Sequence, residues 1–240
     1  MKAIFVMAAL GVVGSLVTAQ TSGSYQLTRK VRPGQTFKFD VEMAFMQDGA
    51  EIKLVGTATE SVLKVEDGNF VFERKLSDIK AIISDRTIDV PEDQAQNMKF
   101  ADIARSIVTS QVTGEVTNIQ KNRTRSVDYA FAAATNAIVG YDYVKIGDTW
   151  TRAIQQGGAP KMDMQFRADK LDVMQGENTV AIALSGKQST TKNGVDASGT
   201  VWISTTTGVA VKTDVMVKNL PLGERGERVD VRMVQTLRKQ

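Results

Sequence analysis

The chain has 240 residues, of which 30 are Lys or Arg and 27 are Asp or Glu, so its net charge is +3, and it contains no His and no Cys. This near balance of charge, with basic residues dispersed along the chain, predicts that nucleic acid is not a partner. Without His and Cys there is no Ser-His-Asp triad, thiol nucleophile, disulfide, or transition-metal site built on imidazole or thiolate. We therefore expect a protein that is not an enzyme and that holds no cofactor and no metal.

Residues 1–19 have the pattern of a secretory signal peptide. Lys2 supplies the positive charge, residues 3–17 are almost all apolar, and Val17-Thr18-Ala19 places small residues before a cleavage site at Gln20. The apolar run of about 15 residues is shorter than the roughly 20 that span a bilayer as a helix, so we expect no retained membrane span. The pattern predicts export, to the periplasm or the extracellular space.

Residues 20–240 are predicted to form a single β-rich unit. A mature chain of about 220 residues buries about 70% of its unfolded surface and needs no disulfides to form a stable core. No linker rich in Pro or Ser divides it. We distinguish a first β-module (20–90), a partly helical connection (91–140) and a second β-module (141–240).

The first β-module shows alternation between apolar and polar residues. Phe37, Phe39 and Val41 alternate with charged residues, which predicts a strand. A turn at Asp48-Gly49 precedes a second predicted strand, 52–65. A turn at 66–69 then leads into a third strand that begins at Phe70, because Asp-Gly between apolar runs favours a tight hairpin.

The connection carries the helical signals. Residues 98–108 place apolar side chains at helical spacing, although 107–116 also has the pattern of a strand. The Ala-rich stretch that follows Ser126 and ends at Gly140 predicts a helix over 127–138, with an N-cap and a glycine stop.

The second β-module returns to hairpins. Predicted strands cover 162–174, 179–184, 195–204, 209–217 and 228–237, with turns at 175–178 and at Thr207-Gly208. The chain as a whole is therefore predicted to be mainly β: an antiparallel meander that forms a broad curved sheet or two facing sheets, with one or two short helices in the middle.

An internal echo indicates that the two modules are duplicates. Arg32-Pro33-Gly34-Gln35-Thr36-Phe37 resembles Lys145-Ile146-Gly147-Asp148-Thr149-Trp150, and each is followed by a similar hairpin, over 58–69 and 168–178. The alternative is that Gly, a polar residue, Thr and an aromatic residue merely mark the entry to any strand. If the modules are duplicates, we expect them to pair across a pseudo-twofold axis.

The order of these elements resembles a group of uncharacterised exported bacterial β-rich proteins, a domain of unknown function. The resemblance rests on the Gly34-Gln35-Thr36-Phe37 strand entry, the acidic hairpin at Asp67-Gly68, the element 144–150 and the hairpin 199–208. It implies a β fold and export, and it transfers no functional residue.

Five residues are candidates for binding an apolar ligand. Trp offers a large apolar face with one hydrogen-bond donor, and Met adapts to irregular ligands. The candidates are Trp150, Trp202, Met162, Met164 and Met174. The alternative for all five is ordinary core packing.

Three functions from different classes remain. The first is a non-catalytic module of the cell envelope that binds or carries an apolar small molecule or lipid. The second is a structural or interaction component with an envelope protein as its partner. The third is a hydrolase using the carboxylates of Asp163, Asp169 and Asp172, whose alternation with apolar residues instead predicts solvent-facing strand positions.

Overall fold

The computed structural model describes residues 23–47, 49–90, 105–111, 116–120, 143–155, 161–189, 194–221 and 227–239. Within these ranges all regular structure is β-strand. The described residues contain no helix that is long and apolar enough to cross a membrane. The strands, in chain order, are β1 (Tyr25–Gln26), β2 (Thr36–Gln47), β3 (Ala50–Glu66), β4 (Asn69–Ile83), β5 (Arg86–Asp89), β6 (Arg105–Gln111), β7 (Val116–Gln120), β8 (Tyr143–Val144), β9 (Thr149–Ile154), β10 (Met162–Met174), β11 (Glu177–Gln188), β12 (Asp196–Ser204), β13 (Ala210–Pro221) and β14 (Arg228–Leu237).

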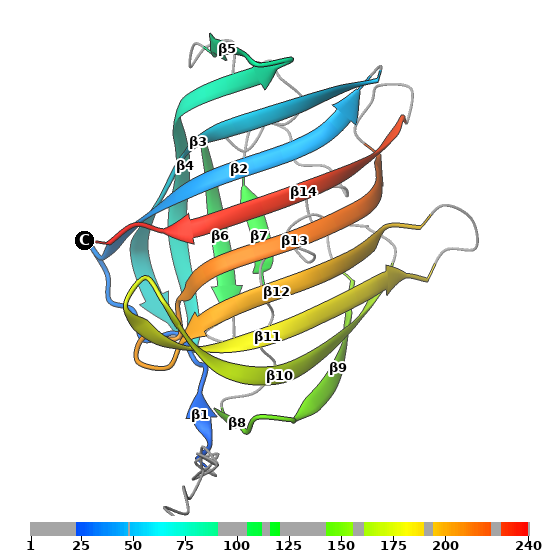
Figure 1. Cartoon of the computed structure of the whole chain (residues 1–240). Helices are drawn as coiled ribbons and strands as arrows, with labels where there is room; N and C mark the ends of the chain where they lie inside the picture. Colours follow the sequence, from blue (N-terminus) through cyan, green and yellow to red (C-terminus); the bar gives the residue numbers. More distant parts are fainter. Residues whose placement is uncertain are drawn as a thin grey trace, which may run out of the picture.

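Twelve strands form one antiparallel sheet, which is broad and strongly curved (Figure 1). Its order is β7-β6-β4-β3-β2-β14-β13-β12-β11-β10-β9, with β5 added against β4, while β1 and β8 form a separate two-stranded sheet. The last strand, β14, pairs with β13 on one side and with β2 on the other, so it joins the C-terminal strands of the sheet to the N-terminal ones. The predicted mainly β class and the broad curved antiparallel sheet are confirmed.

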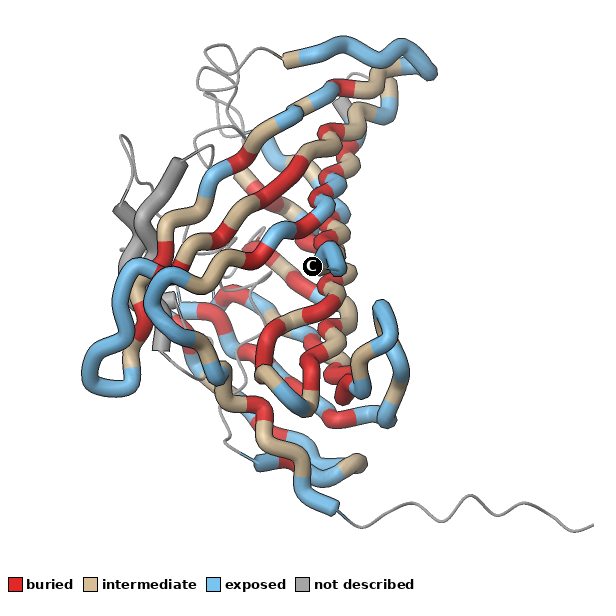
Figure 2. Tube along the Cα trace, turned by 90° about the vertical axis from the view of Figure 1, so that its left-hand side faces the viewer, coloured by how far each residue is buried: buried red, intermediate tan, exposed pale blue. Residues whose placement is uncertain are grey.

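Alternation and tight turns account for the strands. Along β2 the side chains from Phe37 to Phe45 are buried at every second position, and Figure 2 shows similar alternation along neighbouring strands. The two-residue turn between β3 and β4 has φ of 48° at Asp67 and 73° at Gly68. Positive φ at both positions matches the twist of the flanking strands, and glycine adopts it without a Cβ penalty.

The helix predicted over 98–108 is wrong from Arg105 onward, and its residues 98–104 lie outside the described residues. Residues Arg105–Gln111 form β6, in which Ile107 lies opposite Glu73 on β4. The β-branched residues Ile107 and Val108 favour extended backbone, and pairing with β4 satisfies their backbone groups. The helix predicted over 127–138 lies outside the described residues.

The first of the two echoed elements has a specific hydrogen-bond pattern. Gly34 N donates to Val62 O (2.8 Å), Val62 N donates to Gln35 O (2.8 Å), and Gln35 N donates to Arg32 O (3.1 Å). The Gln35 side chain accepts a bond from Arg32 N at 3.2 Å. Gly34 has φ of 82°, and a β-bulge follows Val62.

The second element repeats each of these features. Gly147 N donates to Ala168 O (2.7 Å), Ala168 N to Asp148 O (2.9 Å), and Asp148 N to Lys145 O (3.0 Å). The Asp148 side chain accepts from Lys145 N at 2.7 Å, Gly147 has φ of 95°, and a β-bulge follows Ala168. The two turns therefore have the same local geometry, while common descent of the two modules stays a prediction.

The two modules follow one another in the same direction across the sheet. From one edge the order is β9 to β14 and then β2, β3, β4, β6 and β7. The pairing of β14 with β2 joins the two modules, so β2 does not lie beside its counterpart β9. A pseudo-twofold relation between the modules stays a prediction.

Candidate functional site

One face of the large sheet carries apolar rows that run across the strands. Register partners on neighbouring strands point to the same face. We call one such line of partners the apolar row; it crosses nine strands and consists of Ala81, Leu54, Met43, Met233, Val215, Gly199, Leu184, Phe166 and Trp150. Apart from Gly199, its members are 0–6% exposed.

The next line of partners on this face is also apolar, until it reaches β9. It consists of Ile83, Ile52, Phe45, Val231, Val217, Ala197, Gly186, Met164 and finally Arg152. Most of the members of both lines belong to a single cluster of buried apolar residues. The sheet thus has one extended apolar face, called the inner face below.

The inner face is the concave one. Arg74 on β4 donates from Nη2 to Oε1 of Gln235 on β14, at 2.7 Å. These strands are three places apart in the sheet, a separation of about 14 Å if the sheet were flat. Their side chains meet directly because the sheet curls toward this face.

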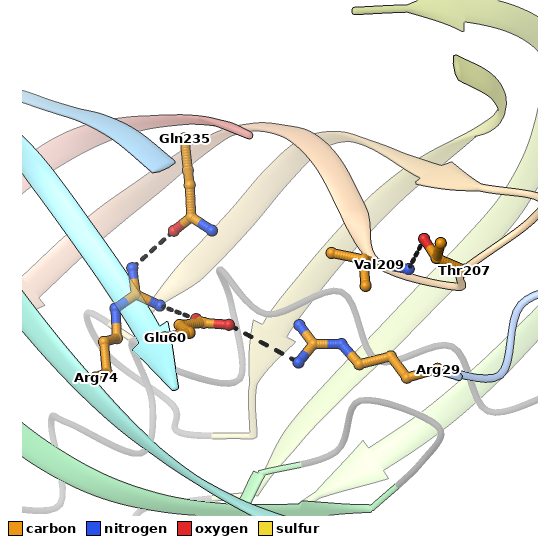
Figure 3. Close-up of polar contacts among 6 residues, drawn as sticks. All are labelled: Arg29, Glu60, Arg74, Thr207, Val209 and Gln235. Carbon is orange, nitrogen blue, oxygen red and sulfur yellow. Dashed lines mark hydrogen bonds and ion pairs between the residues drawn. The ribbon is translucent and has the colours of Figure 1, made fainter. Parts of the chain in front are cut away.

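A charged cluster lies on the inner face, formed by Arg29, Glu60, Arg74 and Gln235 (Figure 3). Glu60 on β3 is 4% exposed; its Oε1 accepts a 3.0 Å bond from Arg74 Nη1, and its Oε2 lies 3.9 Å from Arg29 Nη1. The cluster contains two guanidinium groups and one carboxylate, a formal net charge of +1.

Among the described residues, both guanidinium groups have donors without an acceptor. Nε of Arg74 is buried without a hydrogen-bond partner, and Arg29 donates no side-chain hydrogen bond to any described residue. Instead the guanidinium of Arg29 lies over two rings, 5.1 Å from the Phe70 centroid and 6.0 Å from that of Phe72. Burial lowers the pKa of Arg29; the carboxylate of Glu60 opposes this change and the charge of Arg74 adds to it.

The N-terminal segment holds Arg29 in place. Lys30 N donates to Thr207 O at 2.8 Å, in the turn between β12 and β13. That turn is itself fixed by hydrogen bonds such as the one from Val209 N to Thr207 Oγ1 (Figure 3). Gly208 lets the two segments approach, because a Cβ there would lie 2.2 Å from Thr28 O.

Three of the five candidate ligand residues share the inner face. Trp150 stacks on Phe166, with ring centroids 5.4 Å apart, and lies at the end of the apolar row. Met162 and Met164 on β10 are 2% and 1% exposed, and Met164 packs over Gly186. All three could contact a ligand or simply fill the core.

The other two candidates lie elsewhere. Trp202 alternates with the inward-facing Val201 and Ile203, so it points to the outer face. There its Nε1 donates to Asp172 at 3.3 Å and Lys212 lies 5.2 Å from its ring. Met174 ends β10, beside the turn to β11. The structure therefore does not bring the five together.

The three candidate carboxylates are engaged on the outer face. Asp163, Asp169 and Asp172 pair with Lys161, Arg167 and Lys170, two residues before each along the chain. The hydrogen bonds from Lys161 and Lys170 lower the pKa of Asp163 and of Asp172. Within the described part of the chain, no group of acidic side chains could hold a metal ion.

The charged cluster was not among the candidates drawn from the sequence. Its members lie far apart along the chain, and each resembles an ordinary polar strand residue. The available signal was the position of each residue in the alternating pattern of its strand. Glu60, Arg74 and Gln235 each occupy a position at which the neighbouring inward residues are apolar. A polar residue at such a position needs a buried partner or a ligand.

The fold and this site define a mainly β protein with one broad curved sheet, an apolar concave face and a buried charged cluster on it. No protein-family model matches the chain, and no curated protein matches it. Among solved structures, the chain is similar to one described as lipid-protein interactions in lipovitellin, with a TM-score of 0.50 and 8% identity. That match covers 88% of this chain and 26% of lipovitellin.

A second similar structure is the hypothetical lipoprotein YmcC from Escherichia coli (K12). It matches with a TM-score of 0.35 and 14% identity over 85% of this chain and 84% of the other. The chain thus spans about a quarter of the length of lipovitellin, and at 8% identity that likeness shows the fold alone.

Proposed function

We propose that this protein is an exported, non-catalytic module of the cell envelope that binds or carries an apolar ligand, such as a lipid acyl chain, against its inner face. The observation that carries the proposal is the apolar row, continuous across nine strands of a concave surface. Concave, largely apolar surfaces with a few polar groups are typical of sites for small apolar molecules. The lipovitellin structure, whose description refers to lipid, supports the proposal at the level of the fold.

The chain offers a direct test because it contains two Trp residues, one on each face. The variant Trp202→Phe leaves Trp150 on the inner face as the only reporter. Trp150→Phe leaves Trp202 on the outer face. The probe is the methyl ester of a mid-chain brominated stearate, because bromine quenches indole fluorescence on close contact and the ester carries no charge.

We expect saturable quenching in Trp202→Phe and little in Trp150→Phe. Equal quenching in both variants would show unspecific adsorption and reject the inner face as the site. No quenching of Trp150 up to the solubility limit of the ester would reject the binding of apolar ligands. Circular dichroism of both variants shows whether the sheet is intact.

One observation favours the second candidate, a structural or interaction component. The side chains of the apolar row are as shielded from water as a filled core requires. Within the described part of the chain, β9 has a strand neighbour only on its β10 side, so its other edge could pair with a strand of a partner protein. Absence of quenching in the test above would favour this function.

A further inference from the structure

We infer that the ligand has an anionic head group, a carboxylate or a phosphate ester, which Arg29 and Arg74 bind at the inner face. This inference rests on the proposed function, and it names the chemistry of the ligand that the inner face takes.

Charge balance gives the first argument. The cluster holds two guanidinium groups and a single carboxylate, all mostly buried: the side chains of Arg29, Arg74 and Glu60 are 18%, 14% and 4% exposed. An uncompensated charge in such surroundings is unfavourable, and a single bound anion would make the cluster neutral.

The donors give the second argument. Arg74 uses Nη1 for Glu60 and Nη2 for Gln235, which leaves Nε–H buried with no acceptor. Arg29 approaches Glu60 only at 3.9 Å, which is longer than a hydrogen bond. Oxygen atoms of a carboxylate or phosphate are the acceptors that suit planar guanidinium donors.

The third argument comes from the equivalent place in the second module. Glu60 lies two residues before Val62 and opposite Arg74, in the first of the two echoed elements. In the second element the residue two before Ala168 is Phe166, which lies opposite Leu184. The same local geometry therefore forms with an entirely apolar pair, so this turn does not require the charges.

The cluster is also continuous with the apolar surface. Gln235 lies two residues from Met233 of the apolar row, on the same face of β14. An acyl chain lying on that row could therefore place its head group at Arg74. This arrangement suits an amphiphile whose head group contacts the charged cluster while its acyl chain lies on the apolar row.

The test measures binding of oleate and of its methyl ester by isothermal titration calorimetry, with both delivered from cyclodextrin. Oleate and the ester have the same acyl chain, and only the head of oleate carries a charge. We expect oleate to bind about 10- to 100-fold more tightly, the ratio that one or two charge-assisted hydrogen bonds provide. Inorganic phosphate is titrated separately as a free anion.

Two variants test the residues. Arg74→Leu introduces the residue that the second module has at this place and leaves Arg29 with Glu60, a neutral pair. Arg29→Gln likewise makes the cluster neutral without changing a strand. In both we expect the preference for oleate to fall to about 3-fold or less while binding of the ester is kept. Arg232→Gln, on the outer face, is the matched control and keeps the full preference.

The outcomes separate the inference from the proposed function. Equal affinity for oleate and ester, or an unchanged preference in Arg74→Leu and Arg29→Gln, would overturn the anionic head group and leave the apolar site in place. Phosphate binding as tightly as oleate would show a site for free anions and would also overturn the amphiphile. Failure of both oleate and ester to bind would reject the proposed function itself.

Discussion

Replacing Glu60 by Gln should destabilise the protein far more than the loss of any surface ion pair. The substitution keeps the size of the side chain and removes the carboxylate that lies between the two guanidinium groups, so the net charge of the described cluster rises from +1 to +2. At an effective dielectric constant of about 20, charges 4 Å apart interact by about 4 kcal/mol. Removing one partner from a buried pair costs about 3–5 kcal/mol, and the residual exposure of the two Arg side chains favours the lower value.

The assay is urea unfolding at pH 7, followed by tryptophan fluorescence on protein freed of lipid. We expect the free energy of unfolding of Glu60→Gln to fall by about 3 kcal/mol with an unchanged m-value. Asp214→Asn is the matched control, because it removes a carboxylate from an ion pair on the outer face. A loss below about 1 kcal/mol in Glu60→Gln would refute the reasoning, since it would show that water already screens the cluster.

Three further predictions concern strands β12 and β13 and the turn between them. Gly199→Ala should lower the free energy of unfolding by about 1–3 kcal/mol in urea melts, because a Cβ there would lie 2.2 Å from a backbone oxygen of β13. Gly208→Ala should lower the affinity for oleate although it replaces no residue of the charged cluster, because it displaces the segment that carries Arg29 and strains a φ of +68°. Asp214→Asn should cost less than about 1 kcal/mol at pH 7 and progressively less as the pH is lowered into the acid range, which a pH series of melts will show. The bond from Arg232 lowers the pKa of Asp214, so this stabilisation is present above the unfolded pKa and is lost as the pH falls through the folded one.

Each of these predictions has an outcome that contradicts it. Gly199→Ala with wild-type stability would mean that β12 and β13 can separate at no cost. If Gly208→Ala left the affinity for oleate unchanged, Arg29 would not depend on the turn between β12 and β13. A constant difference between Asp214→Asn and the wild type down to pH 2 would show that ionisation of Asp214 is not its cause.

The strands could be predicted from the sequence because their signals are local. The predicted strands 162–174 and 228–237 coincide with β10 and β14, and the turn at Asp67-Gly68 lies where its sequence predicts. A period of two and a turn that needs positive φ are both read within a few residues. The side on which Trp202 lies could also have been read, since apolar Val201 and Ile203 flank it and occupy the opposite face.

The charged cluster could not be assembled from the sequence because it depends on pairing between distant segments. Gln235 comes near Arg74 only because β14 pairs with β2 and because the sheet curls. Neither the choice of pairing edges nor the curvature is specified by a short stretch of chain, since both follow from the packing of the whole inner face. The alternating pattern marks each of these polar residues as unusual for an inward position, but it does not show that their side chains are in contact.

The comparison of the two modules indicates that the charged cluster has a role other than stabilising the fold. Their strand entries share the same turn, the same hydrogen bonds and a β-bulge at the same place. At one pair of register partners they differ: Glu60 and Arg74 in the first module, Phe166 and Leu184 in the second. Because replacing a buried ion pair by apolar residues is often neutral or stabilising, stability alone does not explain the charges. They place a charged pair in the first module where the second has an apolar one, so a ligand with a head and a tail would lie on the inner face with its head at the first module.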